Sequence, residues 1–149
     1  MPTFDKAAAT TLLASVFAQW VQDLDLSIES IEGDSAVLRM RFSDKLCRDN
    51  GVVCGQALMS LADTAMAFAI CSAAGEYFPM TTVDQTIHFM RPAMRADILA
   101  EARVVRMQEF AGDPFLAGFA PAHFHAVLQH RLAPLRVFAE VDDNLVVFV

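Results

Sequence analysis

Cysteine is scarce in this 149-residue chain, and basic residues are outnumbered by acidic ones. The three cysteines, Cys47, Cys54 and Cys71, are odd in number and show no C-x-x-C spacing. This argues against a disulfide framework or a structural zinc site and favours a reducing cytoplasm. With a formal net charge of −7, the chain lacks the basic footprint that non-specific nucleic-acid binding needs. No basic stretch followed by a long apolar core opens the sequence, so we expect no secretory signal.

Apolar residues are abundant instead. They make up 55% of the chain, against 19% charged residues. The length fits a single domain over residues 1–149 that is large enough to bury a core. Because a small chain cannot hide so much apolar surface alone, we expect a homodimer or homotetramer.

The longest apolar run, 57–74, is of borderline length for a membrane span. It contains Asp63 and has no flanking Lys or Arg anchors. A charge at the centre of a span costs about 2.5 to 3.5 kcal/mol on insertion scales, and alanine offsets little of it. The run therefore predicts a buried helix in a soluble core, with no membrane partner.

Residue patterning predicts an α+β domain of five to six strands around this one long helix. The helix is expected to end at Ala74 before Gly75, a typical residue in the position after a helix C-cap. The other expected elements are a helix over 7–21 capped by Asp5, a hairpin of 26–31 and 36–42, a polar loop over 43–53, strands over 81–90 and 97–107, a short helix over 122–132, and a terminal hairpin of 135–141 and 145–149.

Asp63 is the one carboxylate of the long helix. On a helical wheel it shares a polar stripe about 100° wide with Gln56, Ser60, Thr64 and Cys71. One interpretation is a hydrogen-bonded buried acid that bridges to a neighbouring strand or subunit. The other is a catalytic or ligand-facing group, because a single carboxylate suits general-base activation of water or attack on an activated acyl group. A glycosidase is excluded, since that chemistry needs two carboxylates.

The start of the same helix is the second feature of interest. Its first amides have no intrahelical acceptor and carry the positive end of the helix dipole. The amide of Gly55 or Gln56 would polarise a carbonyl oxygen there, as an oxyanion hole does. A simple loop-to-helix junction is the alternative interpretation.

Two stretches together resemble the PaaI-type branch of the hotdog-fold acyl-CoA thioesterases. They are Asn50-Gly-Val-Val-Cys-Gly-Gln-Ala-Leu-Met-Ser-Leu-Ala-Asp-Thr-Ala-Met-Ala and Thr82-Val-Asp-Gln-Thr-Ile-His-Phe-Met-Arg-Pro. The resemblance covers about residues 26–107. It implies a hotdog fold, an antiparallel sheet wrapped around a central helix, and hydrolysis of a small or medium, including aryl, acyl-CoA thioester without a metal or other cofactor. It also implies active sites built between two subunits.

Position by position, the resemblance implies four roles. Asp63 matches the catalytic carboxylate, and Gly55 matches the glycine whose amide holds the thioester oxygen. Asn50 lies in the loop where the family often has a polar residue near the carbonyl or the attacking water. Thr82, or Thr81 before it, lies where a partner subunit's hydroxyl orients water.

Substrate contacts are expected from the same region. The residues assigned to them are Gln56, Cys54, Thr64, Thr82 and Ser60. Cys54 stands where the family usually has His, and Gln56 where it usually has a second Gly. Cys54 is either a nucleophile or, in the interpretation we favour, a packing residue.

Three remaining features bear on partners. Arg48, Arg91 and Arg95 are either contacts for the phosphates of CoA or ordinary surface charge. His123, His125 and His130 do not have a metal-ligand spacing, so we expect no metal site. Residues 109–134 depart from the family pattern and represent an atypical insertion or an altered segment.

Two other functions stay open. A non-catalytic protein that binds acyl groups, fatty acids or acyl-CoA would be consistent with Cys54 standing where the family usually has His. A hotdog hydratase or dehydratase would need a His paired with the acid, and no His lies near this helix in the sequence.

Overall fold

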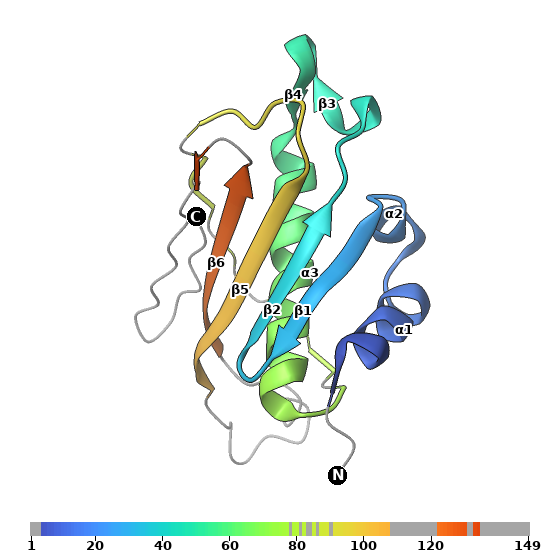
Figure 1. The fold of residues 1–149 in the computed structure, drawn as a ribbon, viewed down its shortest axis with the longest axis vertical. Coiled ribbons are helices and arrows are strands. Elements are labelled where there is room, and N and C mark those ends of the chain that lie inside the picture. The colour runs from blue at the N-terminus through green and yellow to red at the C-terminus, as the bar shows by residue number, and fades with distance from the viewer. Residues whose placement is uncertain are drawn as a thin grey trace.

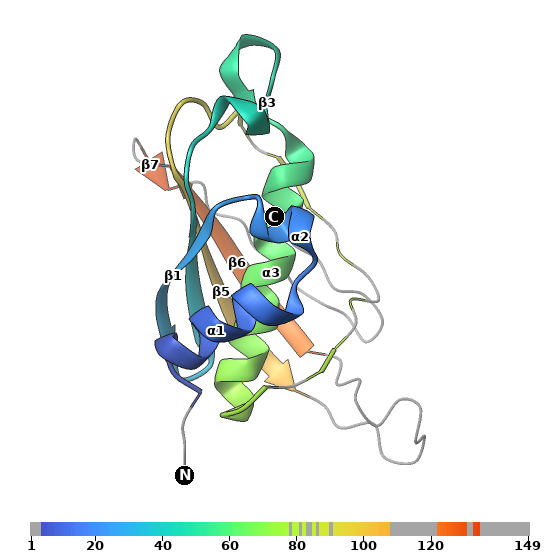
Figure 2. The same cartoon turned by 90° about the vertical axis from the view of Figure 1, so that its right-hand side faces the viewer.

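One long helix lies against one face of an antiparallel sheet (Figures 1 and 2). The computed structural model describes residues 4–77, 79–80, 82, 85, 87–89, 91–107, 122–130 and 133–134. Within them the main sheet has five strands in the order β1-β2-β5-β6-β7, and a second ladder pairs β3 with β4. The helices and strands are α1 (Lys6–Val16), α2 (Gln19–Gln22), β1 (Leu26–Glu32), β2 (Ser35–Met40), β3 (Cys47–Arg48), β4 (Val52–Val53), α3 (Gly55–Ala74), β5 (Ile98–Met107), β6 (Ala122–His130) and β7 (Ala133–Pro134).

The sheet face that meets α3 is lined by small and aliphatic side chains. Ala36 pairs with Ala102, and Leu38 pairs with Ala100, across β2 and β5. These residues are fully buried. Because alanine adds so little bulk, the helix packs close to the sheet, and apolar burial here is the main source of stability.

Helix α3 begins and ends where the sequence predicts. Its C-cap, Gly75, adopts a left-handed conformation with φ 77°, which glycine reaches without steric cost. Ser72 Oγ donates to the carbonyl of Gly33 at 2.9 Å, and the amide of Phe4 donates to that of Gly75 at 3.0 Å. These bonds join the end of the helix to the β1–β2 turn and to the N-terminal segment.

By length and composition alone, α3 is apolar enough to cross a membrane. In this fold 61% of its most apolar window is buried inside the protein. That is the pattern of a core helix, as expected from the sequence.

The N-terminal helix predicted over 7–21 is in fact two helices. Asp5 caps α1 as expected, since its carboxylate accepts from the amide of Ala8 at 2.9 Å. The chain then becomes extended at Phe17, with φ −77° and ψ 145°. Phe17 stacks on Phe68 of α3, with ring centroids 5.4 Å apart, so packing against the core outweighs continued helix.

The short helix predicted over 122–132 is wrong, because these residues form β6. This strand runs antiparallel to β5, with Ala102 opposite Ala126 and Ile98 opposite His130. The free edge of β5 supplies main-chain hydrogen bonds that local sequence preference does not reveal. A strand of the main sheet therefore lies inside the segment expected to be an atypical insertion, 109–134.

Two further expectations differ from the structure. The loop over 43–53 is more ordered than predicted, with single-turn helices at Asp44–Leu46 and Asp49–Gly51 around the β3–β4 ladder. The strand predicted over 81–90 is not formed by Thr82, Gln85 or residues 87–89, which are the described residues of that range. Thr82 and Gln85 bond to α3 instead of to a strand. The predicted hairpin over 135–149 lies outside the described residues.

Candidate functional site

Asp63 lies on the face of α3 that the sheet does not cover. This face also carries Gln56, Met59, Ser60 and Ala67, which are exposed or half-buried. The carboxylate is half-buried, so the fully buried acid expected from the sequence is corrected to one that solvent can reach. Apolar neighbours along α3 fill the sheet side of the helix, which leaves this one stripe open.

A hydroxyl from a distant part of the chain holds this carboxylate. Thr82 Oγ1 donates to Asp63 Oδ1 at 2.6 Å. A hydrogen bond this short to an ionised oxygen is charge-assisted and fixes the carboxylate rotamer. The resemblance assigned a hydroxyl here to a partner subunit, whereas in this structure it comes from the same chain.

Two other hydroxyls of the predicted stripe face their own helix. Ser60 Oγ donates to the carbonyl of Gln56 at 2.8 Å, and Thr64 Oγ1 donates to that of Ser60 at 2.7 Å. Thr64 is only 3% exposed. Back-bonding of this kind satisfies the hydroxyl locally. The structure therefore separates Thr64 from the open stripe and leaves Ser60 at its margin, and Cys71 is buried as well.

At the N-terminus of α3, the N-cap residue supplies no side-chain cap. Cys54 is the N-cap residue, and its side chain makes no capping hydrogen bond. Its amide donates to the carbonyl of Leu46 at 2.8 Å, and its own carbonyl accepts from Leu58 at 3.3 Å. The amides of Gly55 and Gln56 come before this first helical bond and have no acceptor within the helix. They are directed along the positive end of the helix dipole.

Asn50 lies in the turn that precedes this helix start. Its φ of 62° is left-handed, a conformation that asparagine tolerates better than most residues. A Cβ on the next residue, Gly51, would lie 3.3 Å from Arg95 Nε, and Arg95 itself has φ 47°. The turn is held by the bond from the amide of Val53 to the carbonyl of Ala93, at 2.9 Å. Asn50 is exposed on this fixed turn.

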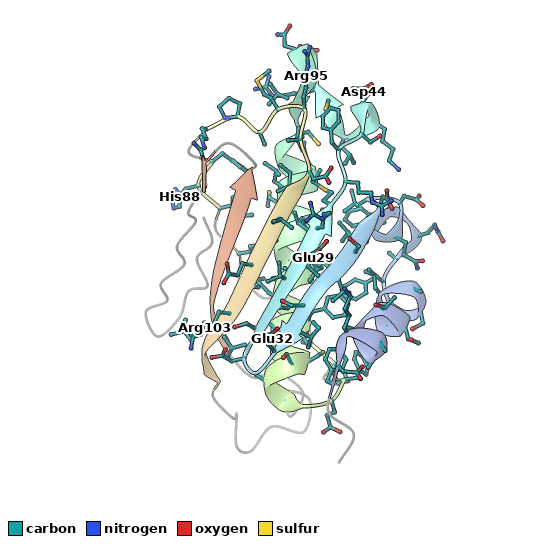
Figure 3. The ribbon with its side chains drawn as sticks, viewed as in Figure 1. Glu29, Glu32, Asp44, His88, Arg95 and Arg103 are labelled. Atoms are coloured by element: carbon teal, nitrogen blue, oxygen red, sulfur yellow. The ribbon has the colours of Figure 1, made fainter. Side chains whose placement is uncertain are left out.

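The three arginines expected near CoA phosphates are all exposed. Arg95 lies at the end of the molecule that carries β3 and β4, and Arg103 lies at the opposite end of the sheet (Figure 3). Arg48 belongs to β3, and Arg91 precedes the bridge between Met94 and Val52. Arg48 and Arg95 thus lie near the end of the molecule where α3 starts, together with the exposed acids Asp44 and Asp49.

Two carboxylates at strand ends of the sheet, Asp97 and Asp34, have lowered pKa values. The amide of Phe42 donates to Asp97 at 2.9 Å and, with Arg39, lowers the pKa of that carboxyl. Hydrogen bonds from Ser35 and Arg103 lower the pKa of Asp34. These contacts stabilise strand ends and take no part in the site.

Sequence reasoning missed one residue at the site. Phe89 packs on Gly55, because a Cβ placed on that glycine would lie 3.2 Å from Phe89 Cζ. The signal available in the sequence was the Phe-x-Arg-Pro stretch, interpreted there as the end of a strand. Among the described residues, no three His, Cys, Asp or Glu side chains gather as a metal site would require.

The region that contains these groups matches a known family. The model of the thioesterase superfamily matches residues 50–109, from the turn of Asn50 through α3 to the end of β5. No curated protein matches the chain.

Solved structures share the architecture at low sequence identity. The PaaI protein of the phenylacetic acid degradation operon of E. coli is 23% identical, over 87% of this chain and 88% of that chain, with a TM-score of 0.61. Zebrafish thioesterase superfamily member 2 is 21% identical, over 85% and 83%, with a TM-score of 0.65. A hypothetical thioesterase from Streptococcus pneumoniae, solved with coenzyme A, is 11% identical, over 74% and 77%, with a TM-score of 0.60.

These findings agree with the resemblance noted in the sequence: the chain has the hotdog fold, and its residues 50–109 match the model of the thioesterase superfamily.

Proposed function

We propose that this protein hydrolyses a small or medium acyl-CoA thioester. The match to the thioesterase superfamily supports thioester hydrolysis as the class of reaction. The neighbour solved with coenzyme A supports CoA as the carrier of the acyl group. The half-buried carboxylate of Asp63, with its donor Thr82, and the uncapped start of α3 supply the two groups that the reaction needs.

The observation that carries the mechanism is the spacing of Gly55 and Asp63 on one straight helix. They are eight positions apart in α3, which at ~1.5 Å per residue places them about 12 Å apart along the axis. A thioester carbonyl must meet its oxyanion donor and its attacking oxygen at about 3 Å each. One chain therefore cannot supply both groups to one carbonyl.

We therefore place each active site between two chains. Asp63 and Thr82 of one subunit form one half, and Gly55 and Asn50 of the partner chain form the other. The open stripe of α3 is the surface through which the halves would meet, and the apolar excess of the chain supports such an oligomer.

In the reaction, Asp63 acts as general base or as nucleophile. As a base, it takes a proton from water while Thr82 holds Oδ1, and the water oxygen bonds to the thioester carbon. The amide of Gly55 stabilises the oxyanion that forms. The carbon–sulfur bond then breaks, and the CoA thiolate receives the proton that Asp63 took. As a nucleophile, Asp63 would attack the thioester carbon, the carbon–sulfur bond would break and the CoA thiolate would leave. Water would then hydrolyse the resulting anhydride, which frees the carboxylate of Asp63 and the acid and supplies the proton that the thiolate takes up.

A non-catalytic acyl-CoA-binding protein is the second candidate. One observation favours it: Cys54 occupies the helix N-cap, where the family usually has His, and its side chain caps nothing. A hydratase or dehydratase has less support. His88, the histidine whose side chain the structure describes, is exposed and makes no hydrogen bond to Asp63.

The test is thiol release from a panel of short, medium and aryl acyl-CoAs, with Asp63→Asn beside the wild type. We expect turnover by the wild type and a fall of about 10²- to 10⁴-fold in the variant, the range for loss of a general acid–base group. Asp44→Asn is the matched control. Asp44 is an exposed carboxylate at the end of the molecule that carries β3 and β4, and its variant should keep full activity. Turnover that survives Asp63→Asn would overturn the mechanism, and tight binding without turnover would favour the second candidate.

A further inference from the structure

Phe89 covers the start of α3 with the tip of its ring. A Cβ built on Gly55 would lie 3.2 Å from Cζ, 3.4 Å from Cε2 and 3.7 Å from Cε1. Cζ is the ring atom farthest from the backbone, so the ring points end-on at Gly55. A distance of 3.2 Å is tighter than an ordinary carbon–carbon contact, so a side chain at this position would push the ring back by a few tenths of an ångström.

Much of the ring is open to solvent. Phe89 is 50% exposed, although one end of it is in contact with the helix start. A large apolar ring that is half exposed beside unsatisfied amides is available to touch whatever those amides bind. It also keeps water from part of the space above them, which strengthens hydrogen bonds made there.

The acyl group is the part of a thioester that such a ring suits. An oxygen that accepts from the Gly55 amide lies about 2.9 Å from it, so the carbonyl carbon and its two substituents come next to the ring. One substituent is the sulfur, which leaves as a thiolate that an apolar ring cannot stabilise. The other is the α-carbon of the acyl group, which is apolar and is bonded directly to the carbonyl carbon.

We propose that Phe89 is a specificity-determining residue. Its ring forms the wall of the acyl pocket beside the α-carbon, and it selects unbranched acyl groups against groups branched at the α-carbon. This inference rests on the proposed thioesterase function. The far end of the acyl chain lies beyond the ring, so Phe89 discriminates branching and not length.

Butyryl-CoA and isobutyryl-CoA are suitable probes, because they are isomers in which one methyl group moves from the end of the chain to the α-carbon. The wild type should prefer butyryl-CoA in kcat/KM. Phe89→Ala should raise the ratio of isobutyryl-CoA to butyryl-CoA by about 10- to 200-fold, the usual range for a methyl group in an apolar pocket. Phe89→Leu keeps apolar bulk, so the same substrate ratio should rise less in this variant. If the alanine variant does not fold, the ratio in Phe89→Leu is the test.

Tyr77→Ala is the matched control. This aromatic side chain is 46% exposed and follows the C-terminal end of α3, about 30 Å along the helix from Gly55 at ~1.5 Å per residue. The substrate ratio should stay at the wild-type value in this variant.

If hydrolysis is intact and the kcat/KM ratio of isobutyryl-CoA to butyryl-CoA is unchanged in both Phe89 variants, the proposed role of Phe89 is wrong. The proposed thioesterase function is not affected by that result. If the wild type hydrolyses no acyl-CoA, the proposed function fails by itself. The ratio is then measured by calorimetry, as the affinities for the thioether analogues of the two substrates. A shift of that ratio in Phe89→Ala supports the wall, whereas an unchanged ratio or absence of binding overturns it.

Discussion

Replacing Gly55 with proline removes one hydrogen-bond donor from the proposed oxyanion hole while keeping a backbone that suits the start of the helix. Gly55 is the first residue of α3, where proline is well tolerated because that amide has no acceptor in the helix. The preceding residue, Cys54, has ψ 148°, within the range preferred before proline. The fold should therefore accept the substitution.

Proline also introduces a Cβ, which would lie 3.2 Å from Phe89 Cζ. The half-exposed ring must yield by a few tenths of an ångström. Gly55→Ala introduces the same Cβ but keeps the amide hydrogen, so it is the matched control for this crowding. The difference between the two variants measures the loss of the amide hydrogen together with the proline ring carbon that replaces it.

Loss of one oxyanion donor costs about 10²- to 10³-fold in kcat, which is about 2.7 to 4 kcal/mol of transition-state stabilisation. We expect Gly55→Pro to fall below Gly55→Ala by this factor in steady-state thiol release, with similar melting temperatures for the two variants. Because the donor acts mainly in the transition state, kcat should fall more than the affinity for substrate. A proline variant as active as the alanine variant would refute the role of this amide.

Three further outcomes follow from described contacts. Thr82→Val removes the hydroxyl that holds Asp63 and should lower kcat about tenfold, at the low end for a hydrogen bond to a charged group, whereas Thr82→Ser should retain most activity. The pKa of Asp97 is lowered by the amide of Phe42, so the stability it contributes is complete above its ordinary value of 3.8 and is lost as the pH falls through the lower folded value. In urea titrations the wild type should exceed Asp97→Asn in unfolding free energy at pH 7 and lose that advantage in acid, and a pH-independent difference would contradict this. Phe68→Ala empties a fully buried position and should lower the unfolding free energy by about 3 to 5 kcal/mol, measured by the same titrations; a loss below about 1 kcal/mol would show that the core is packed differently.

The central helix was predictable because several independent signals agree on it. The apolar run defines its length, Gly75 marks its end, and Asp63 marks the stripe that stays open. The wheel still misplaced Thr64. Its buried hydroxyl bonds to its own helix and does not face the open stripe.

Strand β6 was missed for a reason that lies outside the segment itself. Residues 122–130 contain alternating apolar positions, but also three histidines and a glutamine. A strand forms there because β5 offers a free edge, and that edge exists only after the sheet has been assembled. A single sequence does not reveal such a partner.

The contact between Thr82 and Asp63 shows the same limit at the site. Family resemblance singled out both residues, but their spatial relation depends on the path of the chain across α3. The same holds for Phe89, whose ring reaches Gly55 across 34 positions of sequence. Residue types indicated the chemistry, and tertiary structure decides which groups act together.

Complementation between two inactive variants tests the intersubunit site most directly. Asp63→Asn keeps a wild-type Gly55 half, and Gly55→Pro keeps a wild-type Asp63 half. When the two chains are unfolded together and refolded, mixed dimers should contain one complete site each and recover about a quarter of the wild-type thiol-release rate, since half of the dimers are mixed and each has one of two sites restored. A rate no higher than the sum of the separately refolded variants would contradict a site shared between chains.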